Sequence, residues 1–181
     1  GTMTDRMLYG NLNKNFECIK NKILQSDDLL KFLHYKNISG DGIAALPNLT
    51  SREKIDLIRG DTQKIFPYRK IPQTDDEFDC YISMEYGQVN REIGKVKGVT
   101  KYYKRPSFII YILVPQTLES IVNGSRLLAI EQCIEDAFHV QELEAIGVCR
   151  VGSSNPIDCP SGYLGRMISL SFPEKNESGF K

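Results

Sequence analysis

The hydrophobic pattern is strongest between residues 106 and 138, where a strand-like run precedes an amphipathic segment. Residues 108–114 read FIIYILV, a continuous apolar run flanked by Pro106 and Pro115. A short run of β-branched and aromatic residues with such boundaries is typical of a strand buried on both faces. From Arg126 to about Val140, apolar residues recur at helical spacing, namely Leu127, Ile130, Ile134, Ala137 and Phe138. The pattern predicts the centre of a sheet and a helix across one face of it.

The segments on either side predict further strands. Residues 78–86 alternate between apolar and polar positions, as in a half-buried strand that neighbours the 108–114 run. Residues 147–151 form a short apolar segment, residues 152–156 have loop composition, and residues 164–172 predict a last strand with Ile168, Leu170 and Phe172 facing inward. We therefore expect an α+β fold with β-β-α-β-β order, a largely antiparallel sheet and one main helix packed on a face.

The N-terminal third has helical periodicity instead. Residues 8–37 predict two helical pieces, and Thr50 with Glu53 has the form of a capping box that begins a further short helix. Residues 61–77 contain two prolines and predict an extended crossing segment that places Ile65, Phe66 and Tyr68 on the core. The predicted division is a helical portion at 1–60, an α+β core at 61–172 and a loose tail at 173–181.

Composition narrows the class of protein. Of the 181 residues, 41% are hydrophobic and 25% are charged, and equal numbers of acidic and basic residues give a formal net charge of zero. No net field attracts nucleic acid or a membrane surface. No segment approaches the roughly 18 apolar residues of a membrane span, and none has the form of a signal peptide. We expect a protein made in the cytoplasm, with Gly1 and Thr2 left by an expression vector.

The positive charge is concentrated in one stretch, residues 87–105. Between residues 91 and 105 it holds six cations against one acidic residue, Glu92; they are Arg91, Lys95, Lys97, Lys101, Lys104 and Arg105. One interpretation is a solvated hairpin tip whose lysines prevent edge pairing with other chains. The other is a projecting arm that binds an acidic partner, either phosphate backbone or a carboxylate-rich protein. Glycines at 87, 94 and 98 predict that such an arm is flexible and orders on contact.

Candidate chemistry is sparse. The five cysteines form no CxxC pair and predict reduced, mostly buried thiols, and the zinc alternative of Cys149 and Cys159 with a histidine lacks the usual close ligand spacing. Cys133 and His139 are six residues apart, so on one helix their side chains point apart. The acidic run at 75–77 is better explained as solvated than as a metal site. No P-loop, GxGxxG or GxSxG motif occurs. We expect no enzyme activity, no metal and no cofactor.

The order of elements resembles the tail-terminator and neck proteins of long-tailed bacteriophages. The shared features are an extended Pro-containing lead-in, a basic hairpin between the first two strands, and a closing strand after a Gly-Tyr step. The stretches that carry the resemblance are Lys64–Tyr68, Ser107–Val114, Arg126–Ile130, Ile134–Phe138 and Gly162–Gly165. The resemblance spans roughly residues 61–172 and leaves the helical N-terminal portion unexplained.

The resemblance implies a structural protein of the virion, made in the bacterial host cytoplasm. Such proteins form rings, commonly hexameric, that cap the tail tube and join it to the head-side connector, so the implied partners are further copies of the chain, the tail tube protein, the connector and DNA in the lumen. The basic residues would then line a contact between subunits or face the lumen. Two alternatives stay open: the neighbouring connector or adaptor of the neck, and a small protein that binds nucleic acid or a host factor through the same basic stretch.

Overall fold

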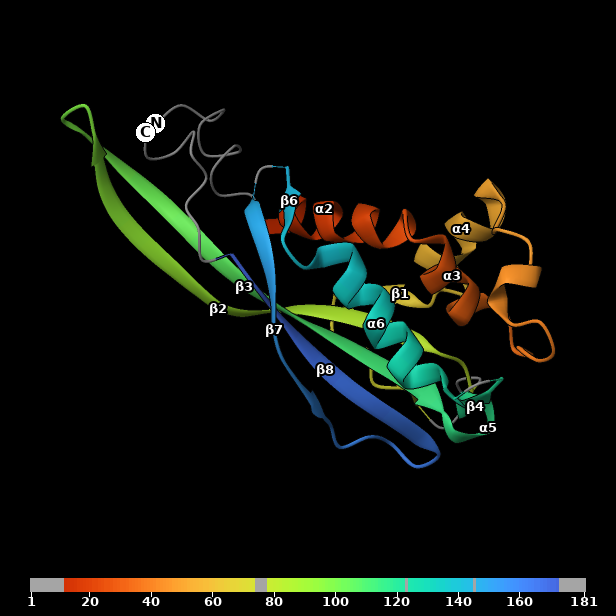
Figure 1. Ribbon diagram of the computed structural model, residues 1–181. Helices are drawn as coiled ribbons and strands as arrows, with labels where there is room; N and C mark the ends of the chain where they lie inside the picture. The colour runs from red at the N-terminus through yellow and green to blue at the C-terminus, as the bar shows by residue number, and fades with distance from the viewer. Residues whose placement is uncertain (1–11, 74–77, 123, 145, 173–181) are drawn as a thin grey trace.

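The computed structural model describes residues 12–73, 78–122, 124–144 and 146–172, and at residues 91, 92, 96 and 101–105 it describes the backbone alone. Within these ranges a six-stranded sheet has the order β1-β2-β3-β8-β7-β6, and β4 and β5 form a small separate hairpin (Figure 1). The elements are α2 (Leu12–Leu24), α3 (Asp27–His34), the 3-10 turn η1 (Ile43–Ala45), α4 (Ser51–Ile58), β1 (Ile65–Phe66), β2 (Tyr81–Val96), β3 (Val99–Pro115), α5 (Gln116–Glu119), β4 (Ser120–Ile121), β5 (Gly124–Ser125), α6 (Arg126–Phe138), β6 (Gln141–Leu143), β7 (Gly147–Pro156) and β8 (Tyr163–Ser171).

The predicted core is confirmed. Strands β2, β3, β7 and β8 with helix α6 follow the β-β-α-β-β order, and these four strands pair with one another antiparallel. The short strand β1 adds a parallel pairing at the outer edge of β2. Strand β3 lies between β2 and β8, with Ile110 opposite Met84 on one side and Ile168 on the other. Helix α6 packs its apolar stripe on this face, where Ile130 and Ile134 are fully buried. The 108–114 run is therefore the sheet centre because it is apolar on both faces.

The N-terminal helices lie on the same face as α6 (Figure 1). Ile19, Ile23 and Leu29 are fully buried and share one hydrophobic core with the sheet and α6. The predicted capping box begins α4: the Thr50 hydroxyl accepts a hydrogen bond from the Glu53 amide at 3.2 Å, and the Glu53 carboxylate accepts one from the Thr50 amide at 3.0 Å. None of the helices in the described ranges is long and apolar enough to cross a membrane.

A buried cation joins the helical portion to α6. The Arg126 side chain is 1% exposed. Its guanidinium donates hydrogen bonds to four backbone carbonyls, those of Phe32 (2.6 Å), Tyr35 (2.7 Å), Lys36 (2.8 Å) and Leu118 (2.7 Å). The Phe32 carbonyl lies in the last turn of helix α3, and the Tyr35 and Lys36 carbonyls come directly after the helix. Carbonyls in the last turn of a helix have no hydrogen-bond partner within the helix. Arg126 therefore caps α3 from the start of α6.

Three details of the sequence-based fold were wrong. Tyr68 is 57% exposed rather than on the core. Strand β2 is buried on both faces near its start, because the amide of Lys70 binds the Ser83 hydroxyl at 3.0 Å and the crossing segment covers that side. The predicted loop at 152–156 is part of β7, which pairs with β8 as far as Pro156 after an irregularity between Val151 and Ser154. The sequence shows the loop composition but cannot show the partner strand.

Candidate functional site

The most prominent feature outside the core is a two-stranded ribbon formed by residues 89–106, which we call the arm. Strands β2 and β3 pair along it from Val89 opposite Pro106 to Val96 opposite Val99. Among the described strands, β1 joins β2 only at Ile82 and Ser83, and β8 joins β3 only from Ser107 onward. Both outer edges of the arm are thus unpaired in the described part of the chain, and the arm extends well beyond the helices (Figure 1).

The arm is a hairpin with a two-residue turn. Its turn consists of Lys97 (φ 51°) and Gly98 (φ 77°). Positive φ at both central residues is the requirement of a type I′ turn, whose twist matches that of the flanking strands. Only these two residues leave the ladder, so Gly94 occupies an ordinary position opposite Lys101. The basic stretch is therefore presented on an extended, paired backbone.

The base of the arm is marked by a bulge. The register between β2 and β3 shifts between Tyr86 and Val89. At Gly87 a Cβ atom would lie 2.6 Å from the Ser107 hydroxyl, which itself donates to the Gln88 carbonyl at 2.9 Å. A bulge bends its strand and increases the local twist. The close packing at Gly87 fixes the direction in which the arm leaves the sheet.

All six predicted cations lie on the arm. The register places Arg91 opposite Lys104, Arg105 opposite Asn90, Lys101 opposite Gly94 and Lys95 opposite Thr100, while Lys97 is in the turn. The side chains of Lys95 and Lys97 are exposed. The backbone register thus gathers all six cations on one two-stranded ribbon.

The arm also carries an apolar tip that the sequence reasoning missed. Ile93 is 69% exposed and Val99 is 56% exposed, the first of these being the most exposed large apolar side chain described. The available signal was the position of both residues close to lysines, Ile93 two residues before Lys95 and Val99 two residues after Lys97. Exposed β-branched residues on a free ribbon are typical of a surface that packs against another chain.

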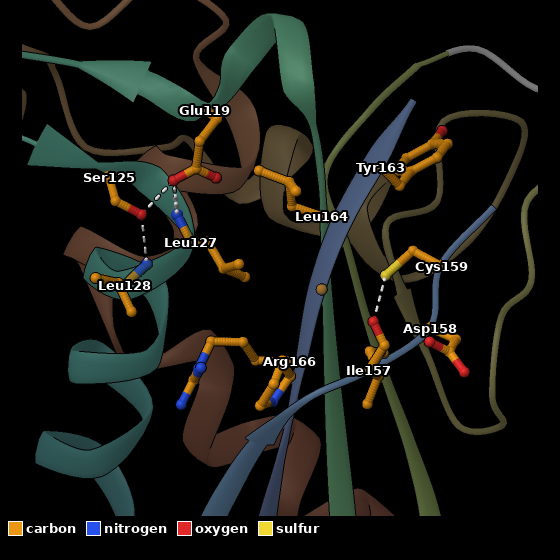
Figure 2. Close-up of a pocket in the computed structure, with 12 residues that line it drawn as sticks. Glu119, Ser125, Leu127, Leu128, Ile157, Asp158, Cys159, Tyr163, Leu164 and Arg166 are labelled. Carbon is orange, nitrogen blue, oxygen red and sulfur yellow. Dashed lines mark hydrogen bonds between the residues drawn. The ribbon is translucent and has the colours of Figure 1, made fainter. Parts of the chain in front are cut away.

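A second feature is a hollow of about 430 Å³ at the other end of the sheet (Figure 2). Its walls are the N-terminus of α6, with Leu127 and Leu128, the β7–β8 connection, with Ile157 and Cys159, and the start of β8, with Leu164. Leu128 is 54% exposed and Leu164 is 37% exposed. No local sequence pattern indicates this hollow. The residues that line it are far apart in the sequence, from Glu119 to Arg166, and they come together only in the folded protein.

The polar groups of the hollow are mostly engaged. Glu119 caps α6, where one of its oxygens accepts from the Ser125 hydroxyl and from the Leu127 amide at 3.2 Å. Its other carboxylate oxygen is buried and has no hydrogen-bond partner among the described residues. Arg166 forms an ion pair with Glu131 at 2.8 Å. The Glu119 carboxylate also interacts electrostatically with the buried Arg126 guanidinium, so Asp158 is the exposed carboxylate of the lining.

The other candidate residues are engaged in ordinary structural contacts. The Nδ1 atom of His139 accepts a hydrogen bond from the Val151 amide at 3.1 Å, and His34 pairs with Glu53 at 2.8 Å. In the described ranges, no group of three or more His, Cys, Asp or Glu side chains could hold a metal ion. The acidic run at residues 75–77 lies outside the described residues.

The cysteines are free thiols, and burial raises the pKa of Cys80 to about 11 and the pKa of Cys149 to about 12. A raised pKa keeps each thiol protonated, and therefore unreactive, well above neutral pH. We expect a thiol reagent at about pH 8 to label the partly exposed Cys18 and Cys159 in the native protein, and to label Cys80 and Cys149 only after unfolding. Mass spectrometry of labelled peptides measures this; rapid native labelling of Cys149 would contradict it.

The fold and its surfaces define the chain as an α+β protein with a projecting basic β-arm at one end of its sheet and an apolar hollow at the other. A family model described as YomW matches residues 26–172, a range that includes both features. The chain belongs to the YomW family. A search of curated proteins gave no match.

Proposed function

We propose that this chain is a structural protein of a long-tailed phage or phage-tail-like particle, which forms a ring at the head-proximal end of the tail tube. The observation that carries the proposal is the arm, a ribbon that projects from the sheet and combines cations with exposed Ile93 and Val99. The tail-terminator resemblance supplies the place of the ring in the particle.

The energetics of the arm support a role in contact between subunits. An isolated two-stranded ribbon is at best marginally stable in water, because it buries little apolar surface. Within the described chain the arm packs against no third strand. A partner that covers its edges and its apolar tip would provide the missing burial. A contact that uses an arm on one subunit and a different surface on the next is head-to-tail and closes into a ring when the rotation permits.

Binding of nucleic acid through the arm is the second candidate function, and its six cations favour it. Each phosphate contact would steepen the loss of affinity with salt, by a slope of about 0.9 per contact. The exposed Ile93 and Val99 favour a protein partner instead, because a phosphate backbone offers nothing for aliphatic side chains to pack on. The neighbouring neck connector would use the same kind of ring contact and differs only in its partner.

Tail tubes assembled in vitro test the proposed role. The purified chain is mixed with tubes of the tail tube protein encoded in the same gene cluster, and the tubes are imaged by negative-stain electron microscopy. The proposal predicts rings at one end of the tubes and an arrest of further elongation. A connector would instead bind the head-side portal and leave tube ends bare. Tubes that grow unchanged, with the chain remaining monomeric, would contradict the proposal.

A further inference from the structure

The arm and the hollow lie at opposite ends of one strand. Strand β3 begins at Val99 in the tip of the arm and ends at Pro115, which pairs with Tyr163 in the wall of the hollow. With about 3.3 Å per residue, its 17 residues separate the two features by about 50 Å. The arm cannot fold back to the hollow of its own subunit, so any contact between them joins two molecules.

We propose that the hollow binds the tip of the arm from a second copy of this chain, an inference that rests on the proposed ring. The apolar parts match: Leu128 and Leu164 stand exposed at the rim of the hollow, and Ile93 and Val99 stand exposed at the tip. A volume of about 430 Å³ lies within the range of roughly 300–1,000 Å³ that binding pockets have. One contact would bury the exposed aliphatic side chains of both surfaces away from water.

The charges match as well. The lining of the hollow includes the exposed carboxylate of Asp158. Its one cation, Arg166, is already paired with Glu131, and its other carboxylate, Glu119, interacts with the buried Arg126. The tip contributes exposed Lys95 and Lys97 beside its apolar residues. Opposite charge around an apolar contact sets orientation and raises the rate of association. Each subunit thus carries one arm and one complementary hollow, the requirement of a head-to-tail ring.

A cysteine at the tip tests the docking directly, because Cys159 already lines the hollow as a free thiol. The variant Val99→Cys is made in a Cys18→Ser, Cys133→Ser background and treated with a short bismaleimide at about pH 8. We expect covalent dimers and higher multiples that disappear when Cys159→Ser is added. Val140→Cys in the same background is the matched control, since Val140 is also exposed, at 52%, and it should give no multiples.

A second variant measures the contact without a cross-link. Leu128→Glu places a charge at the rim on a helix that tolerates glutamate, and it should lower the ring fraction in mass photometry at least tenfold. Val140→Glu matches it in exposure and should leave the ring unchanged.

The outcomes separate the two proposals. Rings without a Cys159-dependent cross-link, or rings that tolerate Leu128→Glu, would overturn the docking and leave the ring intact. A chain that stays monomeric alone and with tail tubes would overturn both.

Discussion

Replacing Arg126 with methionine is expected to lower the free energy of unfolding by about 3–5 kcal/mol. Methionine fills much of the space of the guanidinium stem, but it leaves four buried carbonyls, three of them at or after the end of α3, without the donors they now have. An unsatisfied buried acceptor costs about 1–3 kcal/mol. Relief of the buried charge offsets part of this loss, since burial lowers the pKa of Arg126. Urea denaturation followed by circular dichroism measures the change.

Arg166→Met is the matched control for this prediction. Arg166 forms one ion pair with Glu131, in which the Arg166 side chain is 24% exposed and the Glu131 side chain is 21% exposed. Such pairs contribute about 1 kcal/mol or less. If Arg166→Met destabilises the protein as much as Arg126→Met, the role of Arg126 as the joint between α3 and α6 is wrong.

Replacing the arm cations Arg91, Lys95, Lys97, Lys101 and Lys104 by serine is expected to abolish ring formation and leave the monomer folded. These positions lie on the arm or in its turn, away from the hydrophobic core. Their loss removes the attraction to an acidic partner surface, and the two of these side chains that are described, Lys95 and Lys97, are exposed. Mass photometry should show the ring fraction fall at least tenfold, while the urea midpoint shifts little.

A charge-matched variant separates the arm from net charge. Serine at Lys14, Lys36, Arg52, Lys54 and Arg59 changes the formal charge by the same amount, from positions on the helical portion. That variant should still form rings. If the arm variant assembles as well as the wild type, the arm has no part in assembly.

Local patterns predicted those parts of the fold whose cause is local. The 108–114 strand, the stripe of α6 and the Thr50–Glu53 capping box each depend on residues a few positions apart, and each is present. The burial of Arg126 depends on carbonyls some ninety positions away in the chain. The continuation of β7 through residues 152–156 likewise depends on β8 as a partner. Tertiary pairing overrode turn composition there, and no periodicity could reveal it.

Of the two surface features, the arm could be predicted from the sequence and the hollow could not. The count of charged residues located the arm and all six of its cations, because the six lie within residues 91–105 of the chain. The hairpin between the first two strands was also predicted, but not its turn, in which Lys97 and Gly98 both have positive φ and close a two-residue connection. The hollow was not predicted, since Leu128 and Leu164 belong to a helix and a strand that meet only after folding.

Mass photometry of the unmodified chain over a range of concentrations tests most directly whether this protein assembles through its arm into a closed ring. A closed ring gives two populations, the monomer and one larger species at a fixed integer multiple of the subunit mass, and the fraction of the larger species rises with concentration. A monomer at every concentration, with and without tail tubes, would contradict it, and so would a ladder of ever longer oligomers, because a head-to-tail contact that does not close makes filaments.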